Sequence, residues 1–310
     1  MIRDIQGLHH VTSMASNAQI NNDFFTGTLG LRRVKKTVNF DAPSVYHLYY
    51  GDQAGTPGSV MTYFPFPGMA KGTPGTGEVS TTGFAVPEGA LPFWKERLKA
   101  HGVGGLSEGR AFGAPTLGFD GPDGERFSLI EAEGDTRPGW TGNGVSGDTA
   151  IRGFHSARMR VRDGGATAEL LTYMGYDAVA QEGAVRRFVI DGGNDARTLD
   201  VETLPGVDPA GQGAGSVHHI AFAVEDRAKQ LEVRRALLDT GYQVTPVIDR
   251  DYFWAIYFRT PGGILFEVAT NEPGFDRDED MAHLGEALKL PSQHERNRAR
   301  IERGLPQIVG

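Results

Sequence analysis

The chain contains no cysteine among its 310 residues. This absence excludes disulfides and thiolate metal sites, and it leaves histidine, aspartate and glutamate as the strong metal ligands. No apolar run reaches the roughly 20 residues needed to span a bilayer, and the N-terminus lacks the basic-then-apolar pattern of a secretory signal. We therefore expect a cytoplasmic protein with no membrane partner, in which any metal site uses nitrogen and oxygen donors.

Positive charge is scarce relative to negative charge. The formal net charge is -8 at pH 7, which argues against nucleic acid as a partner because phosphate binding relies on clustered lysine and arginine. The composition of 39% hydrophobic and 23% charged residues is that of a globular protein. A chain of this length accommodates two ordinary domains.

One pattern occurs four times along the chain: an alternating strand, a short amphipathic helix, a glycine at the helix exit, and further strands. The predicted helices cover residues 20–25, 93–98, 170–174 and 231–238, and the modules cover approximately residues 5–66, 78–133, 151–205 and 215–270. Glycine is favoured where a helix ends in a left-handed residue. Glycines stand in this place at Gly30, Gly102, Gly175 and Gly241.

This repeat predicts an α+β protein of four βαβββ modules. Residues 134–150 are rich in glycine, threonine, aspartate and proline, which is typical of a linker. We expect an N-terminal half of two modules at 1–140, a C-terminal half of two more at 151–270, and an extension at 271–310. Within the extension, residues 281–288 and 294–303 are predicted as short charged helices. Plain packing on the modules is favoured for them over covering a sheet edge or the site.

Paired histidines occur at corresponding places in the first and fourth modules. His10 follows His9, His219 follows His218, and Glu267 lies in an apolar strand 48 residues after His219. Two imidazoles and one carboxylate on β-type segments are the ligand set of a mononuclear non-haem iron site with open coordination positions. The sequence therefore predicts one metal site, which is built by the first and fourth modules.

Strand alternation indicates which histidine of each pair faces the site. His219 shares a face with Ala221 and Ala223, whose small side chains leave room for a ligand, and the same parity applies to His10. The alternative is that each histidine is a core residue with a backbone partner and that Glu267 meets an arginine. An unpaired carboxylate is costly to bury, and a metal ion would remove that cost.

The βαβββ repeat resembles the vicinal-oxygen-chelate superfamily, which includes glyoxalase I, bleomycin-resistance proteins and extradiol ring-cleaving dioxygenases. The resemblance is narrower in five blocks, which are similar to the hydroquinone ring-cleaving dioxygenases: Leu8–Thr12, Val34–Phe40, Tyr46–Gly51, Arg250–Tyr257 and Arg259–Gly263. That family opens para-dihydroxylated, often chlorinated, aromatic rings with iron. The resemblance implies two vicinal-oxygen-chelate domains with mixed, barrel-like sheets. It also implies Fe(II) bound by His10, His219 and Glu267, with O2 and a small aromatic molecule as substrates.

The same resemblance implies roles for residues around the metal. Arg250 and Tyr257 are interpreted as groups that orient the substrate and transfer protons, and His9 and Thr12 are weaker candidates for the same work. The alternatives are a surface ion pair between Arg250 and a neighbouring aspartate, and a packing role for Tyr257. Two further histidines, at positions 47 and 218, are interpreted as structural.

Two other functions remain open at this point. A glyoxalase-like isomerase or lyase needs a fourth protein ligand, and the candidates at that position, Thr62 and Tyr63, are not usual metal ligands. A metal-free binding protein of the resistance type would have no need of the triad. His155 with Asp200 or Glu202 is a candidate for a second metal site, although a structural histidine is favoured. The triad also accepts Mn(II), and exposed strand edges permit a homo-oligomer.

Overall fold

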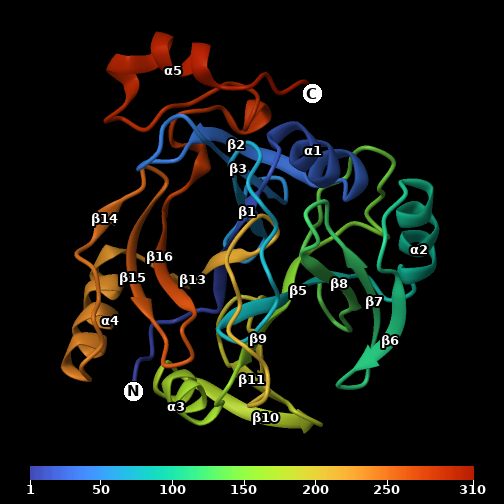
Figure 1. Ribbon diagram of the computed structural model, residues 1–310, viewed down its shortest axis with the longest axis vertical. Helices are drawn as coiled ribbons and strands as arrows, with labels where there is room; N and C mark the ends of the chain where they lie inside the picture. The colour runs from blue at the N-terminus through green and yellow to red at the C-terminus, as the bar shows by residue number, and fades with distance from the viewer.

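The computed structural model describes residues 1–310 and contains two eight-stranded sheets (Figure 1). The first sheet contains, in spatial order, β14 (Ile248–Asp249), β15 (Phe253–Arg259), β16 (Leu265–Pro273), β13 (Val217–Val224), β1 (Leu8–Ala15), β4 (Val60–Pro65), β3 (Tyr46–Gly51) and β2 (Arg32–Val38). The second contains β10 (Tyr176–Glu182), β11 (Val185–Ile190), β12 (Thr198–Thr203), β9 (Gly153–Val161), β5 (Glu78–Val86), β8 (Arg126–Glu131), β7 (Ala114–Asp120) and β6 (Ser107–Ala111).

Each sheet joins one module of the N-terminal half to one module of the C-terminal half. The first sheet combines the first and fourth modules through the antiparallel pair β1 and β13, and the second combines the second and third through β5 and β9. Parallel pairs flank both junctions, so the sheets are mixed, as predicted. The division of the chain at 1–140 and 151–270 stays a prediction, because each sheet takes strands from both halves.

The four predicted module helices are confirmed. They are α1 (Ala18–Asn22), which continues into a π-helical turn η1 (Asp23–Thr28), α2 (Leu91–Ala100), α3 (Gly165–Tyr173) and α4 (Arg227–Asp239). The glycines expected at their exits all have left-handed backbones, with φ of +67° at Gly30, +70° at Gly102, +95° at Gly175 and +88° at Gly241. A residue with a Cβ would be strained at these turns.

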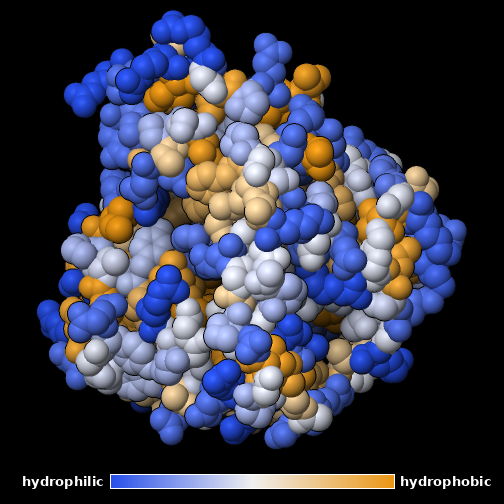
Figure 2. Space-filling view, in the orientation of Figure 1, coloured by the Kyte–Doolittle hydropathy of each residue, from blue (hydrophilic) through white to orange (hydrophobic).

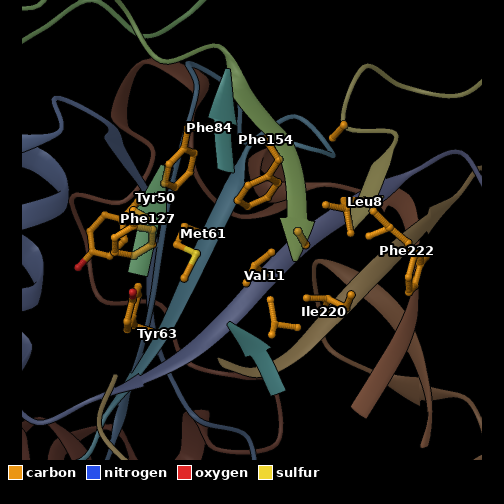
Figure 3. Close-up of a cluster of buried hydrophobic side chains, with 14 of the residues drawn as sticks. Leu8, Val11, Tyr50, Met61, Tyr63, Phe84, Phe127, Phe154, Ile220 and Phe222 are labelled. Carbon is orange, nitrogen blue, oxygen red and sulfur yellow. The ribbon is translucent and has the colours of Figure 1, made fainter. Parts of the chain in front are cut away.

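The two sheets pack against each other through apolar side chains from their central strands (Figure 3). Val11 and Ile220 of the first sheet belong to the same buried cluster as Phe84 and Phe154 of the second, whose rings stack with centroids 5.5 Å apart. Since side chains alternate along a strand, burying this face of β1 and β13 turns the intervening residues to the opposite, concave face. That face carries the candidate site.

The C-terminal extension differs from the prediction in its first half. Residues 281–288 contain only the 3-10 turn η3 (Met281–His283), after η2 (Phe275–Arg277), and Leu288 then forms a parallel bridge with Lys36 of β2. The predicted helix is wrong: Gly285 has a left-handed backbone with φ of +76°, which interrupts a helix, and it packs directly on the backbone of Arg33. The second half contains η4 (Glu295–Asn297) and α5 (Arg298–Gly304), close to the predicted helix.

The extension lies across one end of the first sheet in Figure 1. The face shown in Figure 2 is largely hydrophilic, and it is hollowed beneath the extension. None of the helices has both the length and the apolar composition that crossing a membrane requires. The segment at 134–150 contains no helix or strand, as predicted for a linker.

Glu125 generates a prediction about stability. Its buried carboxylate accepts hydrogen bonds from the Tyr63 hydroxyl (3.0 Å) and the Asp123 amide (2.9 Å), but burial outweighs them and raises its pKa from 4.5 to about 7. Between these pH values the unfolded chain releases a proton that the folded chain retains, so unfolding becomes easier as pH rises. We expect the stability of Glu125→Gln relative to the unsubstituted protein to increase by about 2 to 3 kcal/mol between pH 4.5 and 8.

Urea unfolding of both proteins across this pH range measures the difference. A difference that does not change with pH would contradict the prediction, because it would mean that Glu125 titrates alike in the folded and unfolded chains.

Candidate metal centre

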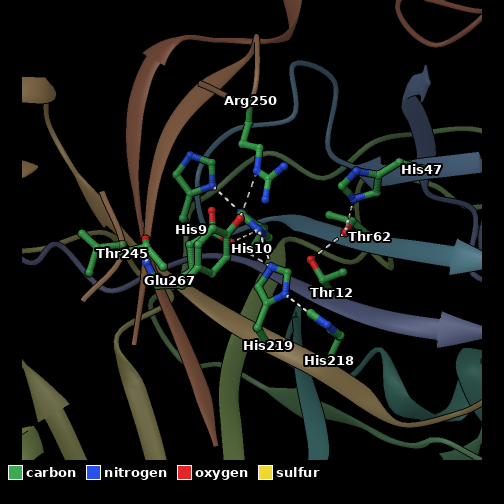
Figure 4. A network of polar contacts seen from close by, with 12 residues as sticks. His9, His10, Thr12, His47, Thr62, His218, His219, Thr245, Arg250 and Glu267 are labelled. Carbon is green, nitrogen blue, oxygen red and sulfur yellow. Dashed lines mark hydrogen bonds and ion pairs between the residues drawn. The ribbon is translucent and has the colours of Figure 1, made fainter. Parts of the chain in front are cut away.

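Three metal-donor side chains from adjacent strands converge on the concave face of the first sheet (Figure 4). His10 of β1, His219 of β13 and Glu267 of β16 place one donor atom each within 4.8 Å of the others. The Nε2 atom of His219 lies 2.8 Å from Glu267 Oε2, and His10 Nε2 lies 3.4 Å from the same oxygen. The two Nε2 atoms are 3.3 Å apart. The structure therefore brings together the three residues that the sequence predicted as metal ligands.

Strand register explains this convergence. Ala221 is paired with His10 on one side and with Glu267 on the other, while His219 is paired with Thr12. The methyl group of Ala221 is fully buried between the longer side chains. A small residue here leaves space at the centre of the three strands, as the alternation of side chains predicted.

The donor set has the character of a cation site. Glu267 is fully buried, and neither of its oxygens has a hydrogen-bond partner. The polar groups nearest to them are the imidazoles of His10 and His219. Burial lowers the pKa of His219 below its usual value, which favours the neutral imidazole with a free lone pair. An unpaired buried carboxylate facing two neutral imidazoles is unfavourable without a cation. The residues thus fit a bound metal ion.

The Nδ1 atom of each candidate histidine ligand contacts the histidine that precedes it. His9 Nδ1 lies 3.0 Å from His10 Nδ1, and His218 Nδ1 lies 2.7 Å from His219 Nδ1, so one nitrogen of each pair carries a hydrogen. His9 is fixed in turn by the carbonyl oxygen of Thr270 at 3.1 Å, and burial lowers its pKa to about 3. Such contacts orient the Nε2 atoms of the ligands toward one point.

A cavity of about 550 Å³ opens in front of the three residues. More than half of its wall is hydrophobic, and the apolar side chains include Met14, Phe40, Phe64, Phe66, Met69 and Leu265. The hollow visible beneath the extension in Figure 2 lies over the same sheet. The size and the apolar lining suit a small aromatic molecule.

Arg250 and Tyr257 both line this cavity, as predicted. The guanidinium lies between two rings, 5.5 Å from the centroid of Tyr257 and 5.3 Å from that of Phe40, and Arg250 Nε donates to the Tyr257 hydroxyl at 3.4 Å. The ion-pair partner of Arg250 is Asp41 at 3.5 Å and not either adjacent aspartate. Burial raises the pKa of Tyr257 well above its usual value, so the hydroxyl keeps its hydrogen.

His9 and Thr12 lie behind the cavity and do not line it. The Thr12 hydroxyl is 2.8 Å from that of Thr62, which is 2.9 Å from His47 Nε2. His47 itself lines the cavity, and its Nδ1 is 2.8 Å from the Tyr49 hydroxyl. His9 and Thr12 therefore contact residues of the site without lining the cavity, whereas His47 lines it directly.

His218 lines the cavity beside His219, although strand parity predicts that it points away from the metal. The register between β1 and β13 shifts between Thr12 and Ser13, which interrupts the alternation at this end of the strand. A bulge of this kind leaves no mark in the residue pattern. Two other cavity residues, Phe40 and Asp41, were missed because they lie in a loop that tertiary contacts fold over the site.

The second sheet has the same strand register as the first, but it lacks the metal-donor side chains. Arg158 takes the place of Ala221, since it is paired with Thr81 on one side and Asp200 on the other. The Asp200 carboxylate accepts hydrogen bonds from Arg187 Nε at 2.8 Å and Nη2 at 2.9 Å. Arginine therefore neutralises the carboxylate that corresponds to Glu267.

Comparisons with known proteins identify the family of the chain. Residues 153–268 match the family described as the glyoxalase/bleomycin resistance protein/dioxygenase superfamily. The chain is 42% identical over 306 residues to MhqO of Bacillus subtilis (strain 168), which carries the provisional name ring-cleaving dioxygenase, and the match covers 98% of this chain and 97% of MhqO. It is 35% identical to the chlorohydroquinone/hydroquinone 1,2-dioxygenase of Sphingobium indicum, with 94% of this chain and 93% of that protein covered.

Solved structures support the same assignment. The crystal structure of a provisionally named dioxygenase from Bacillus subtilis has a TM-score of 0.96 at 42% identity, and the match covers 99% of this chain and 98% of that one. Glyoxalase I from Zea mays shares the fold, with a TM-score of 0.63 at 15% identity over 86% of this chain and 92% of that one. The resemblance inferred from the sequence is confirmed: the chain belongs to the ring-cleaving dioxygenases of the glyoxalase/bleomycin resistance protein/dioxygenase superfamily.

Proposed function

We propose that this protein is a ring-cleaving dioxygenase that uses Fe(II) and O2 to open a hydroquinone-type ring next to a hydroxyl-bearing carbon. The observation that carries the proposal is the buried group of His10, His219 and Glu267 at the base of an apolar cavity. The name of the Sphingobium relative supports hydroquinones as the substrate class.

The donor set supports iron with open coordination positions. His10, His219 and Glu267 would hold the ion through two nitrogens and one carboxylate, which is the facial arrangement of non-haem Fe(II) oxygenases. Bound Fe(II) would supply a redox-active centre with room for both a substrate oxygen and O2. Mn(II) is compatible with the same donors.

Protein groups must orient the ring, because para hydroxyls are too far apart to bind one metal ion together. Arg250 and Tyr257 are suited to this work, since the guanidinium and the phenolic hydroxyl both face the cavity and contact each other. The Tyr257 ring packs edge-on against His219 with centroids 5.7 Å apart, which places its hydroxyl near the donor set. The apolar wall excludes water from the rest of the ring.

The two alternative functions fit less well. An isomerase of the glyoxalase type would take a fourth ligand from β4, but the Thr62 hydroxyl already contacts Thr12 and His47, and the Tyr63 hydroxyl donates to Glu125. A metal-free binding protein would leave Glu267 buried without a partner.

Oxygen consumption tests the proposal. We expect anaerobically purified, Fe(II)-loaded protein to consume O2 when hydroquinone or its methyl or chloro derivative is added, with loss of aromatic absorbance. Glu267→Gln and His10→Ala should abolish uptake because each removes a donor to the metal. Glu125→Gln is the matched control, since it neutralises a different buried glutamate, and it should keep full activity.

Two negative results of this experiment would have different meanings. Protein that holds metal but consumes no O2 would replace the proposal with an isomerase or lyase. Protein that holds no metal would replace it with a binding protein.

Substitution of Arg250 tests the orienting role. Arg250→Ala should lower kcat/KM by about 10- to 100-fold, the range for losing a hydrogen bond to a charged group, while metal content stays unchanged. Arg259→Ala, at the exposed end of β15, the strand that follows the Arg250 loop, should have little effect. Steady-state kinetics of the two variants would contradict the assignment if both lost the same activity.

A further inference from the structure

The segment Pro291–His294 of the C-terminal extension bridges two loops that supply walls of the cavity. One loop joins β2 to β3 and contributes Phe40 and Asp41, and the other joins β14 to β15 and contributes Arg250. The two loops are about 210 residues apart in sequence, and they meet where Arg250 contacts Asp41. A residue that holds both loops in place therefore also fixes the position of Arg250.

The contact with the Arg250 loop is made by Ser292. Its backbone amide donates to Asp251 Oδ2 at 3.0 Å, and its hydroxyl donates to Asp251 Oδ1 at 2.8 Å. Asp251 has a left-handed backbone with φ of +63°, an uncommon conformation for a residue with a Cβ, and contacts from Ser292 and Arg277 stabilise it. Because Asp251 directly follows Arg250, its conformation sets the direction in which the Arg250 side chain leaves the loop.

The contact with the Phe40 loop is made by the next two residues. Gln293 Nε2 and His294 Nε2 both donate to the Phe40 carbonyl oxygen, at 2.9 Å and 2.7 Å. The Phe40 ring is one of the two rings that enclose the Arg250 guanidinium. The segment thus holds Arg250 through its backbone and through its ring neighbour.

The rest of the extension is anchored by other contacts. The fully buried Lys35 ammonium pairs with Asp278 at 2.7 Å and Glu279 at 2.5 Å, and Tyr46 donates to the Pro306 carbonyl oxygen at 2.9 Å. Ser292 is exposed, and substituting it leaves these anchors intact. The contacts of Ser292, Gln293 and His294 with the two loops can therefore be removed while the rest of the extension stays bound to the sheet.

We propose that Ser292, Gln293 and His294 are positioning residues, which fix Arg250 over the cavity by hydrogen-bonding to Asp251 and to the Phe40 carbonyl oxygen. The consequence for turnover rests on the proposed function, whereas the effect on the loops does not. Removing a residue that acts in this way should loosen both loops and weaken substrate binding without changing the metal site.

The test compares three variants by hydrogen exchange and by kinetics in O2 uptake with hydroquinone. Ser292→Ala/Gln293→Ala/His294→Ala removes the three side-chain contacts of the segment. Ser292→Thr/His294→Gln retains a hydroxyl and the amide donors, and Tyr46→Phe removes one hydrogen bond of the extension away from the loops. We expect the first variant to exchange about two- to tenfold faster at residues 39–45 and 250–253, with KM raised by a similar factor. Exchange in β16, metal content and the unfolding midpoint should be unchanged.

Ser292→Thr/His294→Gln should restore slow exchange and KM at least in part, and Tyr46→Phe should change neither. Unchanged exchange in both loops of the first variant, or an equal effect of Tyr46→Phe, would overturn the inference. Absence of O2 uptake by the unsubstituted protein would defeat the proposed function alone, because the exchange comparison would still decide whether the bridge exists.

Discussion

The buried carboxylate of Glu267 is the feature on which the site depends. It lies in an apolar strand with no hydrogen-bond donor, and two imidazoles converge on it. Burying an unpaired carboxylate is strongly unfavourable unless a cation neutralises it. The burial of this one side chain therefore favours a site that binds a cation. Strand register provides room for a cation, because the small residue Ala221 lies between His10 and Glu267 on three neighbouring strands.

The second sheet shows that this chemistry comes from a few side chains and not from the fold. The same register there places Arg158 where the first sheet has Ala221, and Arg187 bonds Asp200 through two N–H groups. Arginine neutralises the carboxylate at this position of the module in the second sheet, and the proposed function assigns this role in the first sheet to a metal ion. This contrast between the two sheets agrees with the general rule that function depends on the side chains of a site and not on the fold.

Local patterns predicted much of the architecture and the donor set. The four module helices, the glycines at their exits and the convergence of His10, His219 and Glu267 are confirmed, because each depends on short-range periodicity or on corresponding module positions. The failures have long-range causes. A register shift brings His218 into the cavity, and the left-handed backbone of Gly285, which packs on the backbone of β2, interrupts the predicted helix in the extension. Neither cause is visible in a single stretch of sequence.

The most direct measurement is an anaerobic calorimetric titration of metal-free protein with Fe(II), for the unsubstituted chain and for Glu267→Gln. The substitution keeps the shape of the side chain but removes its charge. The account predicts one ion per chain, with affinity reduced by about 100-fold or more in the variant, because a charged donor is lost from a buried site. Equal affinity in the two proteins, or no binding to either, would contradict the claim that Glu267 is buried for a metal ion.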